Sequence, residues 1–143
     1  MKIYSCDVCG EMIYFENSLC LNCSSELGYL PLMDNMSSLK LERDFVYQAL
    51  APQANGSSYK KCINYYKENV CNWMVPVEDE NDFCVSCRLN ATIPDLSVPE
   101  NRGYWHRLEI AKRRLVYSLL RLGLPLKNKK EDPECGLAFE FLA

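Results

Sequence analysis

The sequence of 143 residues contains a single histidine, His106, and no His-Glu-x-x-His motif. A catalytic zinc of the two-histidine type therefore cannot be built from this chain alone, because such a site needs two imidazoles and an open coordination position. The sequence also lacks a run of about 18 apolar residues, the length that a transmembrane helix requires. Its first residues lack the apolar core of a secretory signal. These absences predict a cytoplasmic chain without a membrane partner.

Low-complexity tracts and a strong charge excess are absent as well. The chain is 48% hydrophobic and 24% charged, with a formal net charge of -3 and a pI near 5.2. This composition is typical of a globular protein rather than a disordered one. Metal bound by four thiolates would make the chain more acidic still, because four negative sulfurs outweigh one divalent ion. The acidity argues against nucleic acid as a partner.

Cysteine, in contrast, is abundant, with nine residues. Four of them form two Cys-x-x-Cys knuckles separated by ten residues, a spacing typical of a structural zinc ribbon. Gly10 follows the first knuckle, where a tight turn needs a positive φ. The run 12–15 then predicts a strand between the knuckles. The predicted ligands of this first site are Cys6, Cys9, Cys20 and Cys23.

A second set of four cysteines lies within 26 residues and contains one Cys-x-x-Cys pair. Its spacing is less specific, but its count fits a second closed zinc site. The predicted ligands are Cys62, Cys71, Cys84 and Cys87. Two sites of four leave Cys135 as a free thiol, and in a reducing compartment metal explains the cysteines better than disulfides or redox chemistry. We therefore predict two structural zinc ions, without which each ribbon would unfold.

Donors outside the sulfur ligands must offset the negative charge of each site. Backbone N–H groups in the knuckles are the first candidates for this role. The side-chain candidates are Lys2, Lys60, Lys61 and Arg88.

The pattern beyond the first ribbon predicts strands, one long helix and a final strand. Residues 34–51 fit either a strand or a helical face, and we favour a strand. Residues 101–122 form the strongest helical pattern, ended by Gly123 and Pro125. Its apolar positions are Trp105, Leu108, Ala111, Leu115, Leu119 and Leu122. Another side carries Arg107, Arg114 and Arg121, which could bind phosphate but better fit a solvated face or salt bridges.

Residues 137–142 form an apolar run in which Phe139 and Phe141 flank Glu140, a pattern that predicts a C-terminal strand. An exposed strand edge invites association. We therefore expect either that the chain is the N-terminal part of a longer protein, or that a partner or a second copy covers residues 137–142.

Several stretches together resemble bacterial zinc-binding metallopeptidases that carry an N-terminal zinc-ribbon region. The stretches are Cys6-x-x-Cys9-Gly10, Phe15-Glu16-Asn17, Cys20-x-x-Cys23 with Leu27-Gly28-Tyr29, Cys71-Asn72-Trp73, Cys84-x-x-Cys87-Arg88-Leu89-Asn90, Ile93-Pro94-Asp95-Leu96 and the helix 101–125. In that family the ribbon region precedes a catalytic segment with His-Glu-x-x-His. The resemblance implies a structural, docking or substrate-presenting region, without catalysis of its own, whose partner is a missing C-terminal domain or another protein.

The expected fold class is α+β, with small zinc-ribbon β-hairpin units followed by one long amphipathic α-helix and a C-terminal strand. We expect residues 1–95 to form the zinc-ribbon region with both sites. Residues 96–143 would hold a linker, the helix and the start of a peptidase-like domain. The alternative functions are a protein-interaction module and a nucleic-acid-binding ribbon, and the enzymatic activity of a longer protein stays open.

Overall fold

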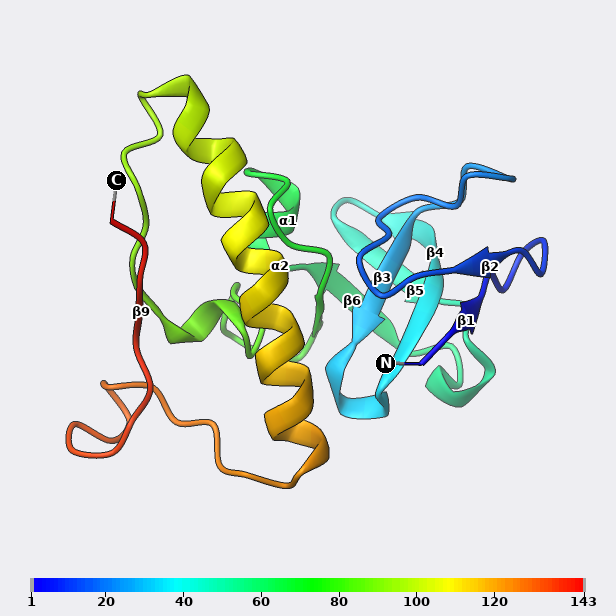
Figure 1. Cartoon of the computed structure of the whole chain (residues 1–143). Coiled ribbons are helices and arrows are strands. Elements are labelled where there is room, and N and C mark those ends of the chain that lie inside the picture. The colour runs from blue at the N-terminus through cyan, green and yellow to red at the C-terminus, as the bar shows by residue number, and fades with distance from the viewer. Residues whose placement is uncertain (1, 143) are drawn as a thin grey trace.

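The computed structural model describes residues 2–142 and has the predicted α+β fold (Figure 1). A small N-terminal ribbon and a curved five-stranded sheet lie on one side of a long helix, α2 (Pro99–Arg121). The C-terminal segment, with strand β9 (Phe139–Glu140), lies on the other side. No helix within residues 2–142 combines the length and the apolar character needed to cross a membrane.

The N-terminal ribbon is a short antiparallel pair of strands, β1 (Tyr4–Ser5) and β2 (Met12–Ile13), with Tyr4 opposite Ile13. The strand predicted over residues 12–15 is therefore present but shorter. Gly10 adopts a φ of +76°, as expected for the turn after the knuckle. Its N–H donates to the carbonyl oxygen of Cys6 at 2.9 Å and so closes the turn.

Five strands form the central sheet, each antiparallel to the next in sequence order. They are β3 (Leu27–Leu30), β4 (Asn35–Arg43), β5 (Val46–Ala49), β6 (Ser58–Lys61) and β7 (Met74–Pro76). The strand interpretation of residues 34–51 is thus confirmed. The sheet is curved, so that β3 lies beside the residues that precede β7. The Tyr29 N–H of β3 donates to the carbonyl oxygen of Asn72 at 2.9 Å.

An aromatic cluster joins the ribbon, the sheet and the helix into one core. The Phe15 ring contacts Tyr29 and Tyr117 edge to face, with centroids 4.9 and 5.2 Å apart. Trp73 is fully buried and packs on Tyr29 at 4.8 Å. Tyr117 belongs to α2, so the helix is packed into the same core as the ribbon.

The predicted long helix is present as α2, but the apolar face expected to be buried is largely exposed. It begins with a proline at its first turn and stops before Gly123, which has a φ of +68°. Of the expected apolar positions only Trp105 is fully buried, whereas Leu108 and Leu122 are exposed. The buried residues are Asn101, Trp105, Glu109, Lys112, Arg113, Val116 and Tyr117. Charged groups can face inward here because each has a partner, as described below.

The remaining elements are a short helix α1 (Ile63–Tyr66), strand β8 (Asn90–Thr92), strand β9 and three 3-10 helices at Pro31–Met33, Pro52–Ala54 and Cys87–Leu89. β8 and β9 pair in parallel, with Asn90 opposite Phe139. The predicted C-terminal strand is thus present, and one of its edges is covered within the chain. Phe141 is buried against Trp105, their ring centroids 6.5 Å apart. Self-association through residues 137–142 stays a prediction.

Candidate metal centres

The first four-cysteine group gathers at the two knuckles of the ribbon. The sulfurs of Cys6, Cys9, Cys20 and Cys23 all lie within 4.8 Å of one another. The two knuckles use the same turn: the Ser24 N–H donates to the Cys20 carbonyl oxygen at 2.9 Å, as Gly10 does to Cys6. Ser24 has a φ of +61°, the left-handed conformation that follows each second cysteine.

Two hydroxyl groups support this first group. Ser38 Oγ on β4 lies 3.3 Å from Cys6 Sγ, and Ser25 Oγ lies 3.1 Å from Cys23 Sγ. Burial opposes ionisation of Cys6, but hydrogen bonds from Ser38 Oγ and from nearby backbone N–H groups outweigh it and lower the pKa of Cys6 to about 6. The Ser25 hydroxyl likewise lowers the pKa of Cys23. These contacts favour the thiolate forms of Cys6 and Cys23, the form that a metal ion requires. At Cys20 a backbone hydrogen bond from Cys23 favours the thiolate, but burial and the neighbouring thiols outweigh it and raise its pKa to about 11.

Asp7 locks the first knuckle onto the sheet. Its carboxylate accepts a hydrogen bond from the Ser38 N–H at 2.6 Å, and its own N–H donates to Ser38 Oγ at 3.0 Å. Sequence reasoning missed Ser38, which contributes through a pairing between distant parts of the chain. Ser25, two residues after Cys23, is the member that a local search could have found.

The second group is more deeply buried than the first. Its members, Cys62, Cys71, Cys84 and Cys87, are exposed by 0%, 4%, 1% and 3%. Their sulfurs also lie within 4.8 Å of one another, although they come from three segments of the chain. Two backbone N–H groups approach the sulfurs at 3.4 Å, from Cys84 to Cys62 Sγ and from Trp73 to Cys71 Sγ. Backbone donors at the knuckles were predicted and are present.

The charge balance of this buried group fits a bound cation. Burial raises the pKa of the Cys62 and Cys84 thiols well above the ordinary thiol value. Burial also opposes ionisation of Cys71, but hydrogen bonds from the neighbouring thiols and the charge of Arg113 bring its pKa well below that value. Four buried thiols cannot all ionise beside one another without a positive ion. A closed set of four thiolates is the ligand set of structural zinc, so two zinc ions fit the residues present.

The lysines and the arginine predicted to stand near the sites do not contact sulfur in the described part of the chain. Each of them pairs with a carboxylate, at Nζ or Nη distances of 2.5 to 2.9 Å. The pairs are Lys2 with Asp34, Lys60 with Asp82, Lys61 with Glu26 and Arg88 with Asp79. That part of the prediction is wrong, because acidic partners lie closer to these side chains than the sulfurs do.

The cation that does act on the second group is Arg113 of α2. It is 2% exposed, and its Nη1 donates to the carbonyl oxygen of Val70 at 2.5 Å, one residue before Cys71. Nothing in the local sequence links Arg113 to Cys71, so sequence reasoning missed it. His106 and Cys135 lie exposed and outside both groups.

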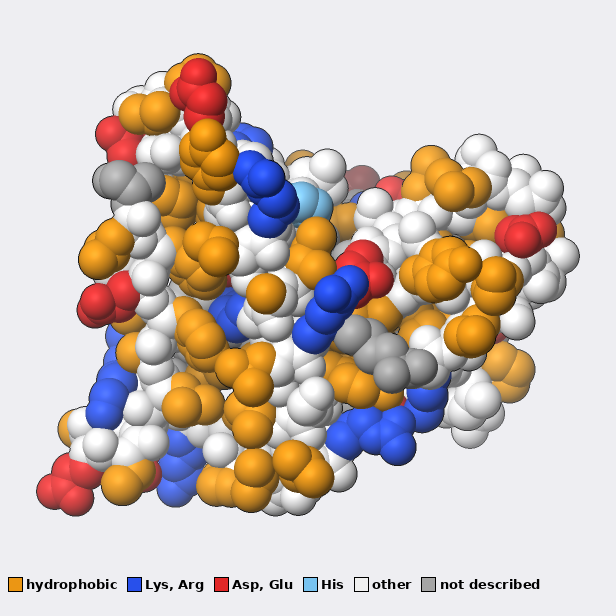
Figure 2. Space-filling view, in the orientation of Figure 1, with side chains coloured by type: hydrophobic (Ala, Val, Ile, Leu, Met, Phe, Trp, Pro, Cys, Tyr) orange, Lys and Arg blue, Asp and Glu red, His pale blue; other side chains and the backbone are white. Residues whose placement is uncertain are grey.

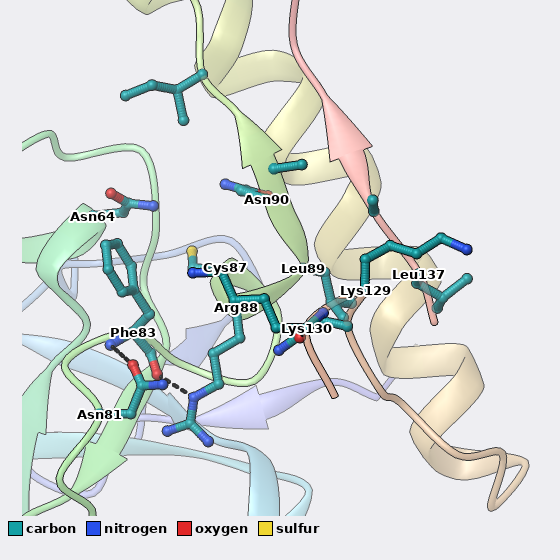
Figure 3. Close-up of a pocket in the computed structure, with 14 residues that line it drawn as sticks. Asn64, Asn81, Phe83, Cys87, Arg88, Leu89, Asn90, Lys129, Lys130 and Leu137 are labelled. Atoms are coloured by element: carbon teal, nitrogen blue, oxygen red, sulfur yellow. Dashed lines mark hydrogen bonds between the residues drawn. The ribbon is translucent and has the colours of Figure 1, made fainter. Parts of the chain in front are cut away.

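A pocket of about 310 Å³ opens beside the second group, between the segment 83–90 and the C-terminal loop (Figure 3). The Arg88 Nε donates to the Phe83 carbonyl oxygen at 2.8 Å at its edge. Asparagine amides and the side chains of Lys129 and Lys130 supply most of its polar lining. No histidine, aspartate or glutamate is among the described residues that line it, so the pocket offers no general base of these kinds for hydrolysis.

Comparison with protein families identifies most of the chain. Residues 3–98, which contain both cysteine groups, match a family described as a zinc-ribbon domain. The chain belongs to this zinc-ribbon family. In this zinc-ribbon chain, residues 101–143 match a second family, described as "Putative zinc-binding metallo-peptidase". The suspected combination of a ribbon region with a peptidase-family segment is therefore confirmed.

The zinc-ribbon chain is also similar to longer mycobacterial proteins. It is 34% identical over all 143 residues to uncharacterized proteins of Mycobacterium tuberculosis strain H37Rv (Rv2568c) and strain CDC 1551 (MT2644) and of Mycobacterium bovis (Mb2598c). The chain spans 38% of the length of each of these relatives. No solved structure gives a significant match.

Proposed function

We propose that this chain is the zinc-stabilised scaffold of a metallopeptidase-like protein, acting in docking or substrate presentation without catalysis of its own. Its division into a ribbon region, residues 1–95, and a helical region, residues 96–143, is part of this proposal. So is a reducing, cytoplasmic location, which would keep the thiols available to metal.

One observation supports the proposal most directly. Two chain segments that carry cysteines of the second group, one at Cys71 and one at Cys87, are hydrogen-bonded to helix α2; we call them the two arms of the group. On one arm, Val70 precedes Cys71 and accepts the hydrogen bond of Arg113. On the other, Asn90 lies three residues after Cys87, and the Asn90 Nδ2 donates to Glu109 Oε1 at 2.7 Å. A metal ion that joins the two arms would therefore fix the helix that belongs to the peptidase-family segment. This arrangement supports a scaffold role for the second zinc.

Hydrogen exchange read by mass spectrometry tests this role. The zinc-loaded chain is compared with the variants Cys84→Ser/Cys87→Ser and Cys6→Ser/Cys9→Ser. We expect loss of the second zinc to raise exchange throughout α2, because its two anchors separate. Loss of the first zinc should affect the ribbon most. Unchanged protection of α2 in the Cys84→Ser/Cys87→Ser variant would contradict the scaffold role.

Closed sites also predict an inactive chain. A catalytic zinc needs an open coordination position, and four thiolates leave none. We expect no cleavage of an unfolded protein substrate such as casein at any zinc concentration. Cleavage that a chelator abolishes and added zinc restores would contradict this expectation.

The ion pairs of α2 do not favour the nucleic-acid alternative. Arg114 pairs with Glu16 at 2.6 Å and Arg121 with Asp34 at 3.3 Å. Two of the three aligned arginines therefore bind carboxylates of the chain itself. Those ion pairs would have to open before the arginines could bind phosphates.

A further inference from the structure

Helix α2 presents a line of large apolar side chains to solvent. Tyr104, Leu108, Leu115 and Leu122 are exposed by 55%, 52%, 47% and 72%. Their spacings of four and seven residues place them on one side of the helix. Figure 2 shows hydrophobic side chains gathered over α2 in this view. We call these four residues the α2 stripe.

The side of the helix that packs against the rest of the chain, in contrast, buries charged side chains. Glu109 and Lys112 are 0% and 3% exposed. Lys112 Nζ lies 2.8 Å from Glu109 Oε2, and the Trp105 Nε1 donates to Glu109 Oε1 at 3.0 Å. Asn90 of β8 bonds to both charged side chains.

This buried network fixes the rotation of the helix. Turning α2 to bury the leucines would separate Glu109 and Lys112 from Asn90, and Arg113 from Val70. Breaking a buried charged pair is strongly destabilising, because it leaves an uncompensated charge in the core. The exposure of the α2 stripe is therefore set by the polar contacts on the other side of the helix. A surface built in this way is characteristic of an interaction site.

We propose that the α2 stripe is the docking surface for the remainder of a longer polypeptide, namely an uncharged apolar face of its peptidase-like part. This inference rests on the proposed scaffold function. Two observations select this occupant: the stripe lies within residues 101–143, which match the peptidase family, and the relatives are much longer than the chain. A lipid surface is disfavoured, because two of the three aligned arginines, Arg114 and Arg121, already bind Glu16 and Asp34, and the third, Arg107, lies over the Tyr104 ring at 5.1 Å.

A chimera tests the proposal in a full-length protein. The present chain replaces the matched 38% of the Mycobacterium tuberculosis relative. Carbene footprinting, by photolysis of a small diazirine and mass spectrometry, then compares labelling in the chimera and in the chain alone. We expect labelling at Leu108, Leu115 and Leu122 to fall on the order of five-fold in the chimera, because residues at the centre of an interface lose nearly all their accessible surface.

Exposed leucines outside the helix serve as matched controls. Leu21 and Leu32, which are 89% and 78% exposed, should be labelled equally in both proteins. Equal labelling of the stripe in both proteins would overturn the docking proposal. If zinc still protects α2 from hydrogen exchange in that case, the scaffold function stands and only the docking surface fails. If zinc does not protect α2, the scaffold function fails.

The chain alone provides a second test that does not depend on the chimera. The variant Leu108→Glu/Leu115→Glu/Leu122→Glu should keep two zinc ions and unfold at an unchanged denaturant concentration, as should the control Leu21→Glu/Leu32→Glu. Unfolding of the stripe variant alone would show that the leucines belong to the core and would overturn the proposal. So would dimerisation of the wild-type chain in sedimentation, or its binding to phosphatidylglycerol vesicles, that the stripe substitutions abolish.

Discussion

The hydroxyl of Ser38 lies 3.3 Å from the sulfur of Cys6, although one residue is on the central sheet and the other is in the ribbon. This contact lowers the pKa of Cys6 and fastens the first cysteine group to β4. Outer groups of this kind commonly change metal affinity by about 10- to 100-fold when removed.

The variant Ser38→Ala should therefore bind zinc in its first site roughly ten-fold more weakly. Loss of the hydroxyl removes a donor to the Cys6 thiolate and leaves the Asp7 N–H without its partner. Competition with a chromogenic chelator measures the affinity. Ser57→Ala, at an exposed serine, is the control and should have no effect. Equal affinities of the two variants would contradict this account of the first site.

Arg113 should stabilise the second site although it lies far from the four cysteines in sequence. Arg113→Met removes the donor to the Val70 carbonyl oxygen and the positive charge that favours the Cys71 thiolate. An unsatisfied buried carbonyl costs about 1–3 kcal/mol. We expect a loss of that size in the free energy of unfolding of the zinc-loaded chain, together with faster release of one zinc ion.

The exposed neighbour Arg114 provides the matched control for Arg113. Its pair with Glu16 is solvent-exposed, with Arg114 56% accessible. Surface pairs contribute about 0–1 kcal/mol, so Arg114→Met should have a small effect in urea unfolding. Similar losses in both variants would show that Arg113 has no special link to the second site.

The buried pair of Glu109 and Lys112 should show strong coupling. Glu109→Leu leaves the Lys112 ammonium buried without its carboxylate, and Lys112→Met leaves the Glu109 carboxylate buried without its ammonium. Each single variant should therefore lose about 3–5 kcal/mol of the free energy of unfolding. The double variant removes both charges and should lose much less than the two single losses added together. A double-mutant cycle in urea measures the difference. Additive losses would mean that the two side chains do not act as a pair.

Acidification should release zinc from both sites, but more steeply from the second. Protonated thiols do not bind zinc, so the stability that zinc contributes is present at high pH and lost as the pH falls. At the first site the pKa values of Cys6 and Cys23 are lowered and that of Cys20 is raised to about 11. At the second site the pKa values of Cys62, Cys84 and Cys87 are raised well above the ordinary value, and that of Cys71 is lowered. Zinc must therefore displace more protons at the second site.

Without metal, the raised pKa values act in the opposite direction. The stability that Cys62 and Cys84 contribute to the folded second site is then fully present below the ordinary thiol pKa of about 8.5 and is lost as the pH rises through their raised values. Cys71, whose pKa is lowered, contributes stability that is lost as the pH falls through its lowered value. Zinc affinity is measured against pH in the variants Cys6→Ser/Cys9→Ser and Cys84→Ser/Cys87→Ser, each of which keeps one site. A steeper dependence at the first site would contradict this assignment.

The cysteine groups and the long helix could be predicted from sequence because their signals are local. Cysteine spacing encodes the first knuckle pair directly, and a three-to-four-residue period with Gly123 at its end encodes α2. The buried face of α2 could not be predicted in this way. Periodicity identifies the stripe with Leu108, but the inward side is decided by Glu109 and its distant partner Asn90.

The curvature of the sheet could not be predicted from the sequence either, because it also depends on contacts between distant residues. Its strands were partly predicted, but the hydrogen bond that brings Tyr29 to Asn72 joins segments far apart in the chain. That contact also brings Trp73 and Phe15 into one core. Ser38 and Arg113 reach the cysteine groups by similarly long-range packing. The cysteines that gather in each group were therefore found in the sequence, and the groups that tune them were not.

Native mass spectrometry of the freshly purified chain tests the central claim most directly, because it counts bound metal ions. We predict two zinc ions per chain, and one in each of the variants Cys6→Ser/Cys9→Ser and Cys84→Ser/Cys87→Ser. A chain that carries no zinc and has instead the lower mass of a disulfide-bonded form would contradict this prediction.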